Sequence, residues 1–261
     1  MKIKDVIATL EEFAPLPLQE SYDNAGLQVG VTGAEVSGVL LCLDVTEAVL
    51  EEAVRRGCNM VVSHHPLLFG GLKRVGDATM VECCVRMAVR RDVTVYSAHT
   101  NLDNARGGVN FRIAERLGLR DVRFLQPMAG GTGGSGVMGE LPEALEAAAF
   151  LRQVKQLFGV EALQHNALLE RPVRTVALCG GAGDFLLDKA LEVGADAFLT
   201  GEMHYHHYFG HEGAIQIGVL GHYQSEQFTI DLLANVLERA CGGLRIVKTE
   251  INTNPIHYLY V

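Results

Sequence analysis

Hydrophobic positions near the start of the chain alternate between helical spacing and short apolar runs. Residues 3–13 carry large apolar side chains three or four positions apart, which predicts an amphipathic helix. The apolar run 39–43 predicts a buried strand, and Thr46 can cap the helix that follows it. Gly57 ends that helix, and residues 60–62 form the next predicted strand.

The same alternation continues further along the chain. The pattern predicts a helix over 77–90, a strand over 93–96 and a helix after Gly108. This order is typical of a parallel or mixed sheet with helices on its faces. The segment 126–137 departs from the pattern, because its five glycines cannot hold a helix, and we expect a linker or mobile loop there. A phosphate-binding loop is the weaker interpretation, since the Gly-Lys-Ser/Thr ending is missing.

An internal similarity links two distant parts of the sequence. Residues 39–65 align with 176–202 at a constant offset of 137 positions and without a gap. Any two strand–helix–strand units share some pattern, but matched residues of distinctive chemistry favour a duplication. The matched pairs include Cys42 with Cys179, Gly57 with Gly194 and His65 with Glu202.

The repeat predicts an α/β protein with two related lobes, each with a mainly parallel or mixed sheet flanked by helices. We place the first domain at 1–125 plus 222–261 and the second domain at 126–221. The two matched strand ends, at His65 and Glu202, would then be equivalent positions. We expect both to face a shared cleft, where ligands of α/β proteins bind.

Composition narrows the class of protein. Among 261 residues there are 22 Lys+Arg and 31 Asp+Glu, which give a net charge of −9 and argue against binding nucleic acid by phosphate neutralisation. No apolar run reaches the ~18 residues that span a bilayer, so we expect no membrane association. The six cysteines lack Cys-x-x-Cys spacing and sit among apolar residues, as in a reducing compartment, so we expect a cytoplasmic protein.

Candidate metal ligands follow the predicted strands. His64 and His65 stand at the carboxyl end of the second strand, and Pro66 favours an extended conformation at His65. Two adjacent imidazoles that diverge there suit one ligand for each of two metals. His99 and Asp103 follow the next strand, although Asp103 can instead cap a following helix. For His64 and His65 the alternative is a surface loop in which the two histidines have no function.

A third segment adds a histidine and a carboxylate. His222 and Glu226 are four positions apart, so a helical turn places them on one face, where they form either a metal site or a surface pair. Five ligands are too many for one catalytic zinc and suit two divalent ions, whether Zn, Mn, Fe, Co or Ni. The His-rich run 203–211 is a rival, but we expect a short helix whose histidines scatter around it and line a rim. The proposed ligands are His64, His65, Asp103, His222 and Glu226.

Five ordered motifs carry a family resemblance: SYDNAGLQVG, SHHPLLF, HTNLD, GADAFLTGE and GHYQSE. Together they resemble the Nif-three-like family of dinuclear metal proteins, often labelled GTP cyclohydrolase I type-two homologues. The resemblance implies a two-domain α/β fold, a homohexamer built from dimers, and a two-metal site between the domains. It assigns the same five ligands and makes Glu226 the bridging carboxylate. Tyr22 departs from the family's usual Trp, and the long central insertion of larger members is missing.

The function that these observations favour is metal-dependent hydrolysis. Two metals lower the pKa of water, which then attacks a phosphoester or a carbon–nitrogen bond of a nucleotide-like small molecule. His99 is the candidate acid–base residue, and Glu202 is a candidate for supporting the site or positioning the substrate. The alternative is a metal-binding carrier, sensor or interaction protein without catalysis, which a closed coordination shell would favour.

Overall fold

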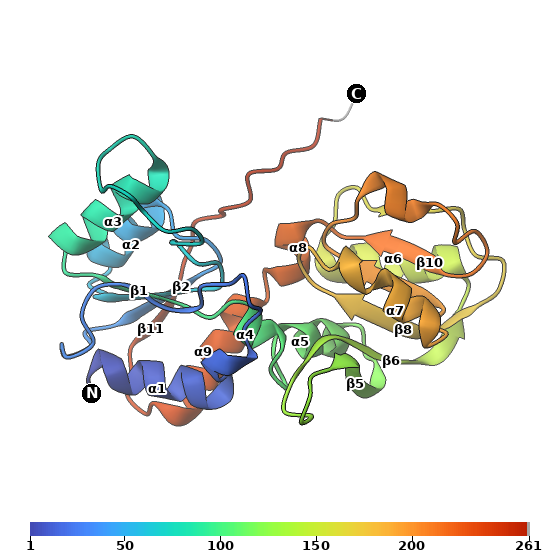
Figure 1. The fold of residues 1–261 in the computed structure, drawn as a ribbon, viewed down its shortest axis with the longest axis horizontal. Helices are drawn as coiled ribbons and strands as arrows, with labels where there is room; N and C mark the ends of the chain where they lie inside the picture. The colour runs from blue at the N-terminus through green and yellow to red at the C-terminus, as the bar shows by residue number, and fades with distance from the viewer. Residues whose placement is uncertain (260–261) are drawn as a thin grey trace. The chain divides into compact units, whose positions relative to one another are not determined.

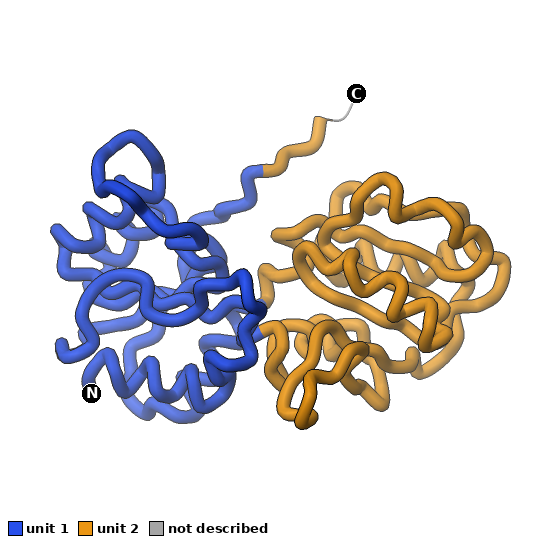
Figure 2. The backbone as a smooth tube through the Cα atoms, viewed as in Figure 1, with its two compact units in different colours: residues 1–102, 229–255 blue, residues 103–228, 256–261 orange. Residues whose placement is uncertain are grey.

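The structure, a computed structural model, describes residues 1–259 and divides into two compact units (Figures 1 and 2). Unit 1 comprises Met1–Leu102 and Thr229–Pro255, and unit 2 comprises Asp103–Phe228 and Ile256–Val261. Each unit contains its own mixed sheet with helices beside it. The predicted fold class, an α/β protein with two such sheets, is therefore confirmed.

The sheet of unit 1 has the strand order β1-β4-β3-β2-β11. Strands β4, β3, β2 and β11 run parallel, and β1 pairs with β4 in the antiparallel sense. The strands are β1 (Gly26–Val29), β2 (Val39–Cys42), β3 (Met60–Ser63), β4 (Thr94–Ser97) and β11 (Ile246–Lys248), and the helices beside them are α1 (Ile3–Phe13), η1 (Leu16–Leu18), α2 (Glu47–Arg55), α3 (Met80–Arg90) and α9 (Thr229–Ala240).

Local sequence explains where these helices begin. The Thr46 hydroxyl accepts the Val49 amide at 3.3 Å, so Thr46 caps α2 as predicted. Thr79 does the same for α3 by accepting the Glu82 amide at 3.2 Å. This cap starts α3 at Met80, three positions after the predicted start. The apolar faces of α2 and α3 pack with β2, β3 and β4 into one core.

The sheet of unit 2 has the strand order β5-β6-β8-β9-β10-β7. Strands β8, β9 and β10 are parallel, whereas β5, β6 and β7 join through antiparallel pairs. The elements are α4 (Thr100–Asp103, at the boundary of the units), α5 (Val109–Arg116), β5 (Arg120–Pro127), β6 (Gly134–Leu145), α6 (Ala147–Phe158), β7 (Gln164–His165), β8 (Val173–Cys179), η2 (Asp184–Leu186), α7 (Leu187–Glu192), β9 (Ala197–Thr200), η3 (Tyr205–Tyr208), β10 (Gln216–Val219) and α8 (His222–Glu226).

The linker or loop predicted over 126–137 is shorter in the structure. Strands β5 and β6 enter this segment from both sides, and Pro127 pairs with Gly134. A β-carbon at Gly134 would lie 2.7 Å from the Gln126 carbonyl oxygen and 2.9 Å from the Phe124 β-carbon. Gly134 therefore permits a close approach of two strands, whereas only residues 128–133 form the connection.

The internal repeat has a structural counterpart. In unit 1, β2 and β3 are parallel with Val39 opposite Met60, and in unit 2, β8 and β9 are parallel with Val176 opposite Ala197. A shift of 137 positions converts one register into the other. The same shift carries α2 onto the segment formed by η2 and α7. The two lobes therefore share a strand–helix–strand unit with the same pairing, as the duplication predicts.

The contact-based units differ from the predicted domain boundaries. Residues 103–125 and 222–228 belong to unit 2, whereas we expected them in the first domain. Compactness does not measure which segments fold independently, so the domain assignment stays a prediction. None of the helices in the described part of the chain has the length and apolar character that crossing a bilayer requires.

Candidate metal centre

His64 and His65 directly follow the carboxyl end of β3 in unit 1. The Ser63 hydroxyl donates a hydrogen bond to the His65 carbonyl oxygen at 2.8 Å. It also forms a hydrogen bond with the Ser97 hydroxyl at 2.8 Å. These bonds fix the backbone where the strand ends. His64 is fully buried, while the side chain of His65 keeps 22% of its surface exposed. The His64 imidazole therefore lies in the protein interior, whereas the His65 imidazole reaches solvent.

Each of these imidazoles contacts an acceptor through Nδ1. His64 Nδ1 lies 2.8 Å from the Ala98 carbonyl oxygen, and His65 Nδ1 lies 2.7 Å from Asp44 Oδ1. Since carbonyl and carboxylate oxygens only accept hydrogen bonds, Nδ1 of each ring is the donor, and Nε2 is the nitrogen whose lone pair could bind a metal. This is the arrangement that metal-ligating histidines adopt, because the partner fixes the orientation of the ring.

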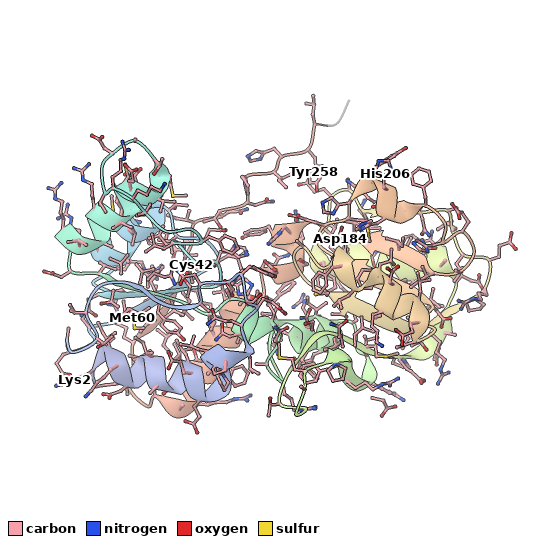
Figure 3. All side chains as sticks on the ribbon, viewed as in Figure 1. Lys2, Cys42, Met60, Asp184, His206 and Tyr258 are labelled. Atoms are coloured by element: carbon pink, nitrogen blue, oxygen red, sulfur yellow. The ribbon has the colours of Figure 1, made fainter. Side chains whose placement is uncertain are left out.

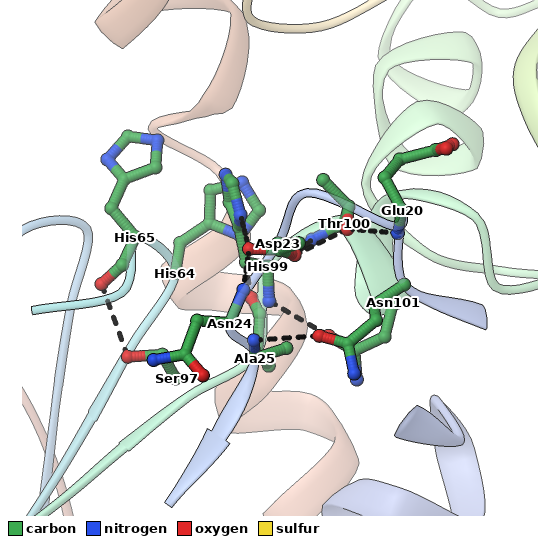
Figure 4. A network of polar contacts seen from close by, with 12 residues as sticks. Glu20, Asp23, Asn24, Ala25, His64, His65, Ser97, His99, Thr100 and Asn101 are labelled. Carbon is green, nitrogen blue, oxygen red and sulfur yellow. Dashed lines mark hydrogen bonds and ion pairs between the residues drawn. The ribbon is translucent and has the colours of Figure 1, made fainter. Parts of the chain in front are cut away.

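His99 follows β4 and forms a third contact of this kind. Its Nδ1 lies 2.7 Å from Asp23 Oδ1, and Asp23 Oδ2 also accepts the Thr100 amide at 3.0 Å and the Thr100 hydroxyl (Figure 4). Burial raises the pKa of the Asp23 carboxyl, but the bonds from His99 and Thr100 outweigh it and lower that pKa to about 2. Asp23 therefore stays ionised and holds the His99 ring.

The three imidazoles form one cluster in unit 1. The ring centroids of His64 and His65 are 4.9 Å apart, and that of His99 lies 5.3 Å and 5.6 Å from them. One nitrogen of each ring lies within 4.8 Å of the other two. The rings converge as donors to a metal would, so the donor set fits a divalent transition ion.

In unit 2, α8 brings His222 and Glu226 together as the spacing predicts. His222 Nε2 lies 3.1 Å from Glu226 Oε2, and His222 Nδ1 lies 2.7 Å from Glu202 Oε1. Glu226 is buried, with 4% of its surface exposed. A β-carbon at Gly181 would overlap its carboxylate, so the backbone after β8 leaves room for this side chain. His222 thus has one carboxylate at each ring nitrogen.

Asp103 ends α4, the short helix that starts directly after His99. The helix that follows, α5, has Gly108 as its N-cap residue. Asp103 is therefore not the cap of the following helix, which was the alternative to ligation. Its backbone carbonyl accepts the Asn110 side-chain amide at 3.1 Å.

Sequence reasoning missed two carboxylates of this region. Asp44 follows β2, and Asp23 lies in the loop before β1. Both hold a histidine that was identified, and only Asp23 lies in one of the quoted motifs. Asp44 could have been found because it follows a buried strand, and Asp23 because it begins the Asp-Asn-x-Gly segment. The histidine that each contacts is distant in sequence, so the pairing itself could not.

The His-rich run contains a separate cluster. His204 and His207 both contact Asp184 Oδ2 through Nδ1, at 2.5 Å and 3.1 Å, whereas we expected the histidines of this run to scatter. Residues 205–208 form a single 3₁₀ turn where we expected a short helix, and the expected scatter of the histidines is wrong for His204 and His207. Burial raises the pKa of the Asp184 carboxyl, but the hydrogen bonds from His204 outweigh it and hold that pKa below its usual value.

The fold and the histidine cluster define a two-lobed α/β protein with a candidate metal centre. The Duf34/NIF3 (NGG1p interacting factor 3) family matches residues 1–255, and the chain belongs to that family. A Lactococcus lactis protein called "GTP cyclohydrolase 1 type 2 homolog" is 34% identical over 98% of this chain and 99% of its own length. A Clostridium perfringens protein of the same name is 29% identical over 99% and 100%.

Solved structures agree with this assignment. A hypothetical protein from Staphylococcus aureus superposes with a TM-score of 0.92 at 25% identity, covering 99% of both chains. A Bacillus cereus protein related to NIF3 superposes with a TM-score of 0.90 at 23% identity, also over 99% of both. The family resemblance and the expected fold are therefore confirmed.

Proposed function

We propose that the protein is a divalent-metal-dependent hydrolase that acts on a small nucleotide-like or phosphoester substrate. One observation carries the proposal: His64, His65 and His99 converge in unit 1, and each has its Nδ1 on a carbonyl or carboxylate oxygen. Such contacts fix the orientation of the rings, which suits His64 and His65 as metal ligands and His99 as a group that transfers protons beside them. The names of the curated relatives agree with a hydrolase acting on a nucleotide.

The proposed ligands of two ions are His64, His65, Asp103, His222 and Glu226. We propose that these five residues would together hold the two ions. The mixture of imidazole and carboxylate donors fits Zn, Mn, Fe, Co or Ni. When bound, such ions supply Lewis-acid chemistry, which polarises a substrate oxygen and acidifies water.

The chain's own residues would handle the proton. His99 is the proposed acid–base residue, because ionised Asp23 holds the proton at Nδ1 and so leaves Nε2 to accept a proton from water or return one to a leaving group. Glu202 would act as a positioning residue. It contacts His222 Nδ1 and so fixes the orientation of the ring, including Nε2, the proposed metal-binding nitrogen.

Two exposed aromatic rings beside the cluster favour a substrate with a planar ring. Phe69 meets His99 edge-on with centroids 6.1 Å apart, and Tyr22 lies 6.4 Å from Phe69. Both are more than half exposed, at 55% and 62%. Asn24 donates to the Leu68 carbonyl oxygen at 2.6 Å and so holds the two loops together. Fixed aromatic rings beside an acid–base residue can stack on a nucleobase.

The test is hydrolysis by the full chain, supplied with Mn²⁺ or Zn²⁺, of a panel of nucleotides and simple phosphoesters. We expect turnover that falls at least a hundredfold in His64→Ala and in Glu226→Ala, while His165→Ala, a change of an exposed histidine in β7, keeps the wild-type rate. Unchanged turnover in the first two variants would remove the mechanism.

The same measurements decide the alternative, a carrier, sensor or interaction protein. Metal bound by the wild type and lost in His64→Ala, with no turnover of any substrate in the panel, would favour it.

The resemblance also leads us to propose a homohexamer, which the mass measured by light scattering will test. No disulfide joins the six cysteines, which all lie within the described residues, and this supports the proposed cytoplasmic location.

A further inference from the structure

We propose that Asp184, His204 and His207 form a second binding site for one divalent transition-metal ion, within unit 2. One ligand atom from each residue lies within 4.8 Å of the other two. None of these three ligands belongs to the proposed ligands of the candidate centre, so the proposal does not rest on the proposed hydrolase function. Figure 3 labels Asp184 and also His206, which stands between His204 and His207 in the sequence; all four residues belong to unit 2.

The fold brings these residues together at the ends of two adjacent strands. Asp184 begins η2, shortly after β8, and His204 precedes η3, shortly after β9, which runs parallel to β8. His204 is the N-cap residue of η3 and His207 lies within it, so both rings stand near the start of this short helix. Their ring centroids are 5.4 Å apart.

Asp184 Oδ2 holds the backbone in front of η3 as well as the two rings. It accepts the amide of His204, the residue that precedes η3, at 3.0 Å, and η3 itself has no side-chain cap. The two imidazoles at the same oxygen are additional. Asp184 is buried, with 9% of its side chain exposed, whereas the side chain of His204 is 82% exposed. The backbone fixes the carboxylate, and the rings are free to adjust around it.

The distances are close to those of a tetrahedral site. Zinc bonds of about 2.0–2.2 Å to nitrogen and oxygen place ligand atoms roughly 3.3 Å apart. Here the Nδ1 atoms of His204 and His207 lie 2.5 Å and 3.1 Å from Asp184 Oδ2. A rotation of the exposed His204 ring supplies the small increase. Glu202 is near enough for its charge to act on His204, which adds to the attraction for a cation.

The donor set indicates which ions bind. Two imidazoles and one carboxylate suit Zn²⁺, Co²⁺, Ni²⁺ and Cu²⁺, whereas Mg²⁺ and Ca²⁺ prefer oxygen donors. Three protein ligands leave a fourth position open to water or to a donor from another molecule. Because the histidines are exposed, ions can reach the site directly from solvent.

The experiment counts zinc ions bound to the full chain. Chelator-stripped protein is dialysed against buffered Zn²⁺ with excess Mg²⁺, and bound zinc is measured by elemental analysis. We expect the double variant His204→Ala with His207→Ala to bind one ion per chain fewer than the wild type. The matched control, His206→Ala with His211→Ala, also removes two histidines from the same segment and should bind as many ions as the wild type.

A second variant guards against a loss of structure. Asp184→Asn keeps an oxygen that can accept the His204 amide but removes the charged ligand, and it should also bind one ion fewer, with an unchanged circular dichroism spectrum in the absence of metal. An equal zinc count in all variants would overturn the proposal, as would an equal loss in the His206–His211 control. Zinc bound at the candidate centre is common to every sample and does not affect these differences.

Discussion

Asp44 holds His65 from the neighbouring strand: its Oδ1 lies 2.7 Å from His65 Nδ1, and its Oδ2 accepts the Thr253 hydroxyl at 2.6 Å. Strands β2 and β3 are parallel, so residues that follow them emerge at the same edge of the sheet. The carboxylate is thus fixed from one side and orients an imidazole on the other.

The first prediction concerns this contact. Asp44→Ala should lower the affinity for Zn²⁺ or Mn²⁺ by roughly 10–100-fold, because the His65 ring loses its orientation and part of its basicity. Isothermal titration calorimetry on the chelator-stripped protein measures the change. Asp188→Asn alters an exposed acid of α7 and should leave the affinity unchanged. Equal affinity in the wild type and in Asp44→Ala would show that this contact does not support a ligand.

The second prediction separates proton transfer from metal binding at His99. His99→Gln should reduce turnover by roughly 10²–10⁴-fold, the range for loss of an acid–base group, while the number of bound metals stays constant. Asp23→Asn should reduce turnover through the same ring, since the ionised carboxylate no longer holds the Nδ1 proton. A lost metal ion in His99→Gln would instead make His99 a ligand.

The third prediction concerns pH and the Glu52 carboxylate. Glu52 is buried on α2 and accepts the Glu250 amide at 3.1 Å, Arg56 at 3.0 Å and the Thr249 hydroxyl. Burial raises the pKa of Glu52, but these bonds outweigh it and lower that pKa below the usual value. A lowered pKa in the folded state stabilises the protein above the unfolded pKa of about 4.3, and this stability is lost as the pH falls through the folded value.

Glu52→Gln should therefore lower the free energy of unfolding at pH 7 by about 1.5–3 kcal/mol, the range for hydrogen bonds to a charged group. The difference from wild type should shrink below the unfolded pKa. Urea denaturation at pH 7 and at pH 3.5 tests both statements. Glu51→Gln, at the exposed neighbouring position of the same helix, should change stability little at either pH. A constant difference across that range would contradict the assignment.

The fourth prediction concerns the close approach of β5 and β6. Gly134→Ala should destabilise the protein by about 1–3 kcal/mol, because the new methyl group would overlap the Gln126 carbonyl and Phe124. Thermal unfolding followed by circular dichroism measures the loss. Gly33→Ala is the matched control, since a β-carbon there meets nothing within 4 Å. Equal melting temperatures would show that the strands separate at no cost.

Sequence reasoning located the histidines better than it located their partners. His64, His65 and His99 were recognised because each follows an apolar run, and parallel strands bring such positions to one edge of a sheet. The contact of His99 with Asp23 spans 76 positions, and periodicity carries no information about such pairs. Gly134 was misread for a different reason: a glycine that lets two strands approach looks the same in sequence as one in a loop.

The shared register of β2–β3 and β8–β9 makes His65 and Glu202 counterparts. In an assembly of two identical chains, every substitution occurs twice, so both copies of a position must carry the same side chain. Two lobes on one polypeptide can instead carry different side chains at equivalent positions. His65 is a base and Glu202 is an acid, so the two halves have diverged here. Mutational scanning should find that each position tolerates a different set of amino acids.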